Sequence, residues 1–434
     1  MADSRSDKVR RDYMKRSVGE HRLHPETQMM GYGYDPSLSE GALKPPLFLT
    51  STFAFDRAQD GKEFFELAYQ KREASEGEEM GLIYSRINNP NYEILEDRLA
   101  LWEEAEKGLV FASGMSAIST ALWAYLRPGD VLVHSEPIYG GTEFLARNIL
   151  PEFGVKTVSF RAGGPQPTLA PAVEKARSLG RVAVIYTETP ANPTNDLVDL
   201  NAARQMADRL EQEQGYRPIV MTDNTFLGPV WQKPLQQGAD IVLYSLTKYI
   251  AGHSDVVAGA AIGSKAVMTP VQGFRTILGT QCDPHSCWLV MRSLETLKLR
   301  MEKSNENAAR VAAFLKDHPK VTHVNYLGFL ADDDPNKAIY DRQCLGAGST
   351  FAFTVKGDEA AAFRVLDALS VIKLAVSLGG TESLMEAPYS MTHSDVPDHV
   401  KDGLGMTPSM LRISVGVEHP DDLIADLAQA LDHA

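Results

Sequence analysis

Short apolar runs alternate with segments of helical length from Pro90 to about residue 290. The runs that predict strands are Leu109–Ala112, Val131–His134, Val155–Phe160, Val182–Thr187, Ile219–Thr222, Ile241–Tyr244 and Val256–Ile262. The segments that predict helices between them are Met115–Leu126, Thr142–Ile149 and Leu200–Glu213. Strands that are apolar along their whole length must be covered on both faces, and crossover helices provide that cover. The alternation therefore predicts an α/β fold with a mostly parallel sheet and helices on both faces.

The pattern changes after about residue 290, where a long helix is expected at Met291–Leu315. It is followed by predicted strands at Phe351–Val355, Lys373–Ser377 and Leu411–Val415 and predicted helices at Glu359–Leu369 and Asp421–Leu431. Before Pro90, glycines and prolines interrupt any period, and residues 59–82 are charged and Glu-rich, which favours a solvated helix or a loop. We therefore expect an N-terminal arm and loop over 1–88, a large domain over 89–290 and a smaller C-terminal α+β domain over 291–434.

The charge of the chain argues against two classes of partner. Its formal net charge is -14 and its pI is about 5.3, whereas nucleic acids and anionic membranes favour clustered basic residues. No apolar run is long enough to cross a bilayer, and Met1–Arg16 is too charged for a secretory signal. The 3 cysteines form no CxxC pair, so reduced thiols in a cytoplasm are expected rather than disulfides or a zinc site. These features predict a cytoplasmic protein that acts on a small molecule and holds no metal.

A lysine follows the predicted strand Ile241–Tyr244 in the stretch Tyr244-Ser-Leu-Thr-Lys-Tyr-Ile-Ala-Gly-His253. Ligands of open α/β sheets bind at the carboxyl ends of strands. The hydroxyls of Ser245 and Thr247 suit a phosphate, and the amine of Lys248 is placed to meet an aldehyde. Taken alone, however, a Ser-x-Thr-Lys stretch is more often an ordinary surface lysine after a strand.

Two further stretches also fit either a ligand-binding site or an ordinary turn. Asp223 ends the predicted strand Ile219–Thr222, where a carboxylate could hold a heteroaromatic nitrogen protonated or could merely cap a turn. Gly114 lies in Phe111-Ala-Ser-Gly-Met115, which leads from a strand into a helix. Free amides at a helix start favour an anion, although a plain tight turn would look alike.

Taken together, the ordered motifs resemble the Cys/Met-metabolism family of enzymes that use pyridoxal 5′-phosphate (PLP), a family that includes cystathionine γ-synthase, cystathionine γ-lyase and methionine γ-lyase. The resemblance runs from about Lys44 to the C-terminus. It rests on the Lys248 stretch and on Tyr84-Ser-Arg-Ile-Asn-Asn-Pro90, Ala112-Ser-Gly-Met-Ser-Ala117, Tyr139-Gly-Gly-Thr142, Glu188-Thr-Pro-Ala-Asn-Pro-Thr194, Asp223-Asn-Thr-Phe226, Ser377-Leu-Gly-Gly-Thr-Glu-Ser383 and Leu411-Arg-Ile-Ser-Val-Gly416. It implies the aspartate-aminotransferase-like (type I) PLP-dependent transferase fold, PLP as the cofactor, and a homo-oligomer of shared sites, expected to be a tetramer.

The resemblance also implies roles for residues around the cofactor. Lys248 is expected to carry PLP as a Schiff base and to move the substrate Cα proton, and Asp223 is expected to face the pyridine nitrogen. Tyr139 is expected to stack on the ring and, with water as the alternative, to protonate the leaving group. The expected phosphate cradle consists of Gly114, Met115, Ser245 and Thr247.

Other matched positions concern the substrate and the neighbouring subunit. Arg412 and Ser377 are expected to contact the substrate α-carboxylate, and Asn192 is expected to lie beside the cofactor. An arginine suits this role because its guanidinium binds a carboxylate through two parallel hydrogen bonds. Tyr84 and Arg86 are expected to reach the phosphate bound by the neighbouring subunit.

The motifs leave the reaction open between γ-elimination, as in a lyase, and γ-replacement, as in a synthase or O-acylhomoserine sulfhydrylase. Val376 resembles methionine γ-lyase, because cystathionine-cleaving relatives often carry a glutamate there. Gly141 departs from the methionine lyases, which typically carry a cysteine at that position. We expect γ-elimination on a methionine- or homoserine-type amino acid. A PLP-binding protein without catalysis is disfavoured because Lys248, Asp223 and Arg412 are all retained.

Overall fold

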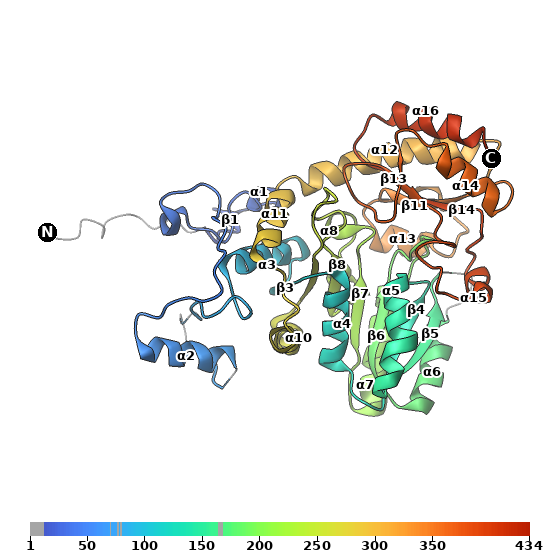
Figure 1. Ribbon diagram of the computed structural model, residues 1–434. Coiled ribbons are helices and arrows are strands. Elements are labelled where there is room, and N and C mark those ends of the chain that lie inside the picture. Colours follow the sequence, from blue (N-terminus) through green and yellow to red (C-terminus); the bar gives the residue numbers. More distant parts are fainter. Residues whose placement is uncertain (1–12, 70, 76–77, 79, 164–167) are drawn as a thin grey trace.

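A seven-stranded sheet occupies the centre of the molecule (Figure 1). The computed structural model describes residues 13–69, 71–75, 78, 80–163 and 168–434. The strands of this sheet, in spatial order, are β3 (Lys107–Phe111), β9 (Gly259–Gly263), β8 (Ile241–Ser245), β7 (Ile219–Asp223), β6 (Arg181–Glu188), β4 (Asp130–Glu136) and β5 (Lys156–Arg161). Neighbours from β8 to β5 pair in parallel, and β9 is antiparallel to both of its neighbours. The predicted α/β class and mostly parallel sheet are confirmed.

Helices cover both faces of this sheet, which explains why its strands are apolar throughout. In β8, Ile241 and Leu243 pack in one cluster with the helix Gly114–Tyr125, and Val242 and Tyr244 pack in another with the helix Pro90–Glu103. The helices of this part are α3 (Pro90–Glu103), α4 (Gly114–Tyr125), α5 (Gly140–Phe144), α6 (Leu169–Leu179), α7 (Leu200–Gln214), α8 (Gly228–Trp231), α9 (Pro234–Gln237), α10 (Lys265–Leu278) and α11 (Pro284–Leu294), with the shorter turns η2 (Leu145–Ile149) and η3 (Leu150–Phe153) after α5.

A second, five-stranded sheet belongs to the C-terminal part, drawn in orange and red in Figure 1. Its strands, in spatial order, are β10 (Val321–Asn325), β11 (Thr350–Val355), β14 (Met410–Ser414), β13 (Leu384–Glu386) and β12 (Lys373–Leu374). The helices of this part are α12 (Leu297–Asp317), α13 (Lys337–Gln343), α14 (Glu359–Asp367), α15 (Asp398–Gly403) and α16 (Pro420–Leu431), with the turn η4 (Leu327–Phe329). The described residues therefore contain two large sheets besides the two-stranded pairing of β1 (Ser17–Val18) with β2 (His21–Arg22), and the domain boundary at residues 290 and 291 stays a prediction.

Several elements differ from the sequence-based expectation. The helix expected at Met291–Leu315 is divided into α11 and α12, because the side chain of Thr296 donates to the carbonyl of Ser293 (3.3 Å) and competes with the helical backbone. Strands β10 and β13 were not predicted. Strand β12 ends at Leu374, and Ser377, expected within it, has a φ of 93° that no strand accommodates.

The N-terminal segment extends away from the seven-stranded and five-stranded sheets (Figure 1). It contains β1 (Ser17–Val18), β2 (His21–Arg22), α1 (Pro25–Gln28), η1 (Pro36–Ser39) and α2 (Ala58–Ala68). Helix α2 accounts for the amphipathic start of the charged segment 59–82, while residues 70, 76–77 and 79 of that segment lie outside the described residues, as do residues 1–12 of the predicted arm. Leu38 and Leu43 are each 80% exposed. The contact of this arm with a neighbouring subunit stays a prediction.

Candidate active site

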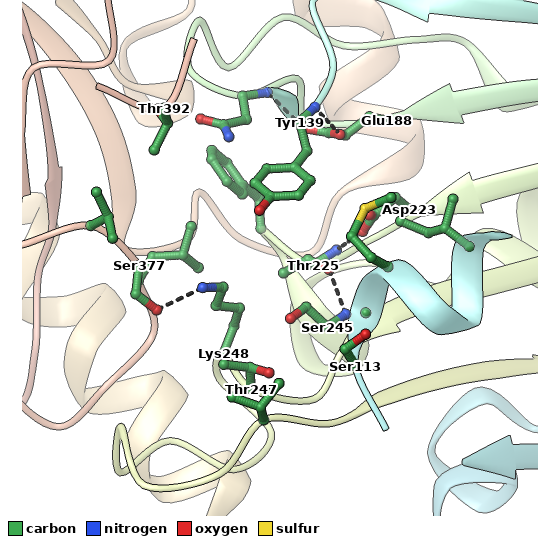
Figure 2. Close-up of a pocket in the computed structure, with 18 of the residues that line it drawn as sticks. Ser113, Tyr139, Glu188, Asp223, Thr225, Ser245, Thr247, Lys248, Ser377 and Thr392 are labelled. Carbon is green, nitrogen blue, oxygen red and sulfur yellow. Dashed lines mark hydrogen bonds between the residues drawn. The ribbon is translucent and has the colours of Figure 1, made fainter. Parts of the chain in front are cut away.

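A cavity of about 280 Å³ opens at the carboxyl ends of the central strands, where ligands of such sheets bind (Figure 2). One wall comes from the ends of β6, β7 and β8 and the start of α4, and the opposite wall comes from the C-terminal part. The residues that line it are Ser113, Gly114, Met115, Ile118, Tyr139, Glu188, Asn192, Asp223, Thr225, Phe226, Ser245, Thr247, Lys248, Val257, Val376, Ser377, Leu378, Thr392 and Arg412. The fold thus brings together the predicted site residues, except Tyr84 and Arg86.

Lys248 extends into this cavity from the turn after β8 (Figure 2). Its Nζ donates a hydrogen bond of 2.6 Å to Oγ of Ser377, which links the two walls. Burial, together with the nearby charge of Arg412, lowers the pKa of Lys248 to about 8, while Glu386 opposes that shift. A larger fraction of this amine than of an ordinary lysine is therefore neutral near neutral pH, which is the form that reacts with an aldehyde.

Asp223 is the last residue of β7 and is buried. Its Oδ1 accepts a hydrogen bond of 2.9 Å from the backbone N–H of Thr225. Burial raises the pKa of Asp223, and Glu188 is its register partner on β6. Two buried carboxyls on neighbouring strands favour a cation or a shared proton close to them. This environment suits a protonated ring nitrogen.

The start of α4 forms a cradle together with the turn after β8. The hydroxyl of Ser113 caps the helix by accepting from Ser116 N–H at 3.0 Å. A Cβ added at Gly114 would lie 3.0 Å from Cβ of Ser245, so a larger residue would crowd this close approach. Thr247 is fixed because its hydroxyl donates to the carbonyl of Ala258 (3.2 Å) and accepts from the N–H of the same residue (3.1 Å). Helix N–H groups and hydroxyls in this arrangement fit a phosphate.

Tyr139 immediately precedes α5, and its ring is directed into the cavity (Figure 2). Its backbone N–H donates to Oε2 of Glu188 (2.7 Å), while its side chain remains 42% exposed. The ring also lies against Gly141, where an added Cβ would be 2.7 Å from Cε1 of Tyr139. A side chain at residue 141 would therefore require this ring to move.

Arg412 reaches the cavity from β14 and is only 3% exposed. Its Nη1 donates to Oδ1 of Asn192 (2.9 Å), and its Nη2 donates to the carbonyl of Ser377 (2.9 Å) and pairs with Oε1 of Glu386 (2.7 Å). A buried guanidinium held by side chains from both parts of the molecule is a suitable receptor for a carboxylate.

Tyr84 and Arg86 lie outside the cavity formed by their own chain. Arg86 donates from Nη1 to the carbonyl of Thr276 (2.6 Å), and its guanidinium lies 5.8 Å from the centroid of the Tyr84 ring. Their predicted role toward a neighbouring subunit is therefore neither fulfilled nor contradicted within one chain.

Sequence reasoning assigned no role to several residues of the site. Glu188 ends β6 as Asp223 ends β7, so the strand-end rule that singled out Asp223 could have found it. Thr225, whose hydroxyl accepts from Ser245 N–H at 3.0 Å, carries no such signal. Thr392 and Glu386 meet the site only through tertiary packing.

Among the helices of the described ranges, none combines the length and the apolar character that a bilayer span requires.

The comparisons with known proteins agree with this geometry. Residues 26–432 match the family model described as "Cys/Met metabolism PLP-dependent enzyme". The L-methionine gamma-lyase of Pseudomonas deceptionensis is 38% identical over 408 residues, which cover 93% of this chain and 96% of the relative. The cystathionine gamma-lyase of Sus scrofa is 36% identical over 413 residues, covering 95% and 94%. The crystal structure of cystathionine gamma synthase from Xanthomonas oryzae pv. oryzae in complex with cystathionine has a TM-score of 0.83, is 32% identical, and covers 95% of this chain and 98% of its own.

Proposed function

This chain belongs to the Cys/Met-metabolism family of PLP-dependent enzymes, and from that premise we propose that it catalyses γ-elimination on a methionine- or homoserine-type amino acid. The products would be a 2-oxo acid, ammonia and the released thiol or oxygen-linked group. The observation that carries the proposal is the position of Lys248, which places its Nζ 2.6 Å from Ser377 in the cavity that Arg412 also lines. A proton acceptor and a carboxylate receptor thus face the same space.

The residues present fit PLP. Close approach at Gly114 leaves the α4 start and the hydroxyl of Ser245 to hold the phosphate, and the hydroxyl of Thr247 would join them by turning its hydrogen from the Ala258 carbonyl to the phosphate. Asp223 would hold the ring nitrogen, and Lys248 would attach the cofactor through Nζ. When bound, PLP supplies an electron sink that stabilises negative charge at the Cα atom of an amino acid.

The remaining steps belong to side chains of this chain. Arg412 would orient the amino acid by its α-carboxylate, and Ser377 would accept a hydrogen bond from Lys248 Nζ, as it does here. The lowered pKa of Lys248 lets Nζ accept a proton near neutral pH. Tyr139, with its ring in the cavity and its backbone held by Glu188, would donate a proton to the leaving group.

Substrate choice would depend on Val376, which lines the cavity and is 55% exposed. An apolar side chain offers no partner for the distal ammonium of cystathionine, and methionine or an O-substituted homoserine needs none. The relatives named methionine gamma-lyase support this choice. γ-Replacement is the second candidate, favoured by the match to cystathionine gamma synthase structures.

A substrate panel tests the proposal. The PLP-loaded protein would be given methionine, O-acylated homoserine or cystathionine, with and without an added thiol, and 2-oxobutanoate, ammonia and thiol would be measured. We expect 2-oxobutanoate and ammonia from methionine or O-acylated homoserine without added thiol, and Val376→Glu should shift the preference toward cystathionine. Products that form only when a thiol is added would instead establish γ-replacement. If cystathionine is already the best substrate of the unmodified protein, the reasoning about Val376 is wrong.

We further propose that the protein works in the cytoplasm as a homo-oligomer, a dimer of shared sites within a tetramer. Two observations support this. Cys282, Cys287 and Cys344 are free thiols. Tyr84 and Arg86 lie outside the cavity of their own chain, in a part of the molecule with exposed leucines such as Leu43.

A further inference from the structure

The carboxylate of Glu386 lies behind the cavity wall and pairs with Arg412, the residue proposed to bind the substrate α-carboxylate. Glu386 ends β13, is 1% exposed and is the register partner of Arg412 on β14. Its Oε1 pairs with Nη2 of Arg412 at 2.7 Å and accepts a hydrogen bond of 3.1 Å from the hydroxyl of Thr392. Arg412 and Thr392 line the cavity, whereas Glu386 is absent from the lining residues. Glu386 is therefore positioned to act through its two neighbours.

The geometry of the guanidinium makes this competition direct. A carboxylate binds an arginine bidentately along one of two edges, Nε with Nη2 or Nη1 with Nη2, and both edges use a hydrogen of Nη2. Nη2 carries two hydrogens; in this structure Nη2 donates to the carbonyl of Ser377 (2.9 Å) and forms an ion pair with Oε1 of Glu386 (2.7 Å). A bidentate substrate carboxylate must therefore displace or share one of these partners.

We propose that Glu386 is a positioning residue that holds Arg412 until the substrate α-carboxylate takes its place on Nη2, and that Glu386 takes up a proton at that step. The inference rests on the proposed role of Arg412 in binding that carboxylate. Two buried carboxylates against one guanidinium leave an uncompensated negative charge, and a proton on Glu386 removes it. Its Oε2 is buried and has no hydrogen-bond partner within the described residues, so this oxygen is open to the proton.

The charges around Glu386 are consistent with uptake of a proton by this residue. Burial raises the pKa of Glu386, and the opposite charges of Arg412 and Lys248 and the hydroxyl of Thr392 lower it. Engaging Arg412 with another anion weakens the strongest of these lowering influences. His393 follows Thr392, and burial lowers the pKa of this histidine to about 4. It is therefore neutral near neutral pH and is a poor acceptor for the proton.

Calorimetry on the PLP-loaded protein tests the proposal. The probe would be 4-(methylsulfanyl)butanoate, which carries the carboxylate of methionine but has no amine to react with the cofactor. Titrations near neutral pH in two buffers with different ionisation enthalpies report the protons taken up on binding. We expect uptake approaching one proton for the unmodified protein, no uptake by Glu386→Gln, and a Kd for this variant that is lower by about threefold or more, since a competing charge is removed.

Glu103→Gln is the matched control, because Glu103 is another carboxyl that is 1% exposed and its partner is Tyr244 rather than Arg412. It should bind the probe and take up protons as the unmodified protein does. If Glu386→Gln does not fold, Thr392→Val tests the same proposal. Loss of the Thr392 hydroxyl raises the pKa of Glu386, so more of this carboxyl is protonated before the probe binds and proton uptake on binding should be smaller. Binding by the unmodified protein without proton uptake, or equal uptake by Glu386→Gln, would overturn the proposal. Failure of the unmodified protein to bind the probe would instead overturn the role given to Arg412.

Discussion

Burial determines what individual side chains of this cavity can do. The same desolvation that lowers the pKa of Lys248 raises that of Asp223, because in each case the charged form loses its hydration. An amine becomes available as a base near neutral pH, and a carboxyl gains a strong preference for a cationic partner. Both effects depend on the closed environment rather than on residue type.

The first prediction concerns the pH dependence of cofactor attachment. Only the neutral amine reacts, so attachment of PLP to the cofactor-free protein should be slow below pH 8 and should accelerate as pH rises through about 8. Stopped-flow absorbance of the attached cofactor measures this midpoint. Lys248→Ala should show no attachment, and mass spectrometry after borohydride reduction should find the adduct on Lys248. A midpoint near 10.5, or an adduct on another lysine, would contradict the assignment.

The second prediction separates charge from capping at Asp223. Asp223→Asn retains a side-chain oxygen that can accept from Thr225 N–H but removes the negative charge. Turnover should fall by about 100-fold or more, as when other electrostatic partners of a reacting group are removed, and PLP should be held more weakly. Steady-state kinetics and cofactor retention after dialysis measure both effects. Near-normal turnover in a folded Asp223→Asn variant would show that Asp223 is only a turn cap.

At the scale of elements, the site depends on how closely one helix start approaches one strand end. Helix α4 begins at Gly114 directly against Ser245 at the end of β8, and its N-cap Ser113 shapes the turn that leads into it. The N-terminal end of a helix attracts anions, and its first N–H groups have no partner within the helix. Such a cradle is effective only if backbone and phosphate can come close, which explains the glycine at this position.

The third prediction tests this close approach. Gly114→Ala places a Cβ 3.0 Å from Cβ of Ser245, so the end of β8 and the start of α4 should move slightly apart and the affinity for PLP should fall by about tenfold, equivalent to about 1.4 kcal/mol. Equilibrium titration with PLP measures this affinity. Gly273→Ala in α10 is the control, because its added Cβ has no atom within 4 Å and alanine favours a helix. The Gly273→Ala variant should bind PLP normally, and an equal loss in both variants would refute the cradle.

At the scale of the whole molecule, the cavity joins two parts of the chain and leaves a third part unassigned. The hydrogen bond between Lys248 and Ser377 and the contacts of Arg412 with Asn192 connect the central sheet to the C-terminal sheet. None of the described residues of the N-terminal segment lines this cavity, and this segment exposes large apolar side chains. A site complete only in an assembly would account for both observations.

The fourth prediction is complementation between two defective chains. Lys248→Ala and Arg86→Ala should each be inactive or weak alone. If Arg86 serves the site of a neighbouring subunit, a mixed dimer has one site with both defects and one with neither. Activity should therefore return when the variants are mixed under conditions of subunit exchange, as followed by turnover and by native mass spectrometry. Confirmed exchange without recovered activity would mean that Arg86 serves its own chain.

The sequence alone was sufficient for the α/β class, the positions of the central strands and most residues of the cavity. The strands could be predicted because continuous apolar runs report burial on both faces, and the convergence of strand ends on one edge of a parallel sheet indicated Asp223 and Lys248. Other cavity residues, such as Tyr139 and Arg412, were expected only from the resemblance to the family. The break between α11 and α12 depends on one side chain competing with the backbone, and the exposed edge strand β10 has a weak apolar pattern. Only the tertiary structure could bring Glu386 and Thr392 to Arg412, because they come from an antiparallel pairing and an irregular loop that no local period encodes. The shifted pKa of Lys248 likewise exists only once distant segments exclude water from it.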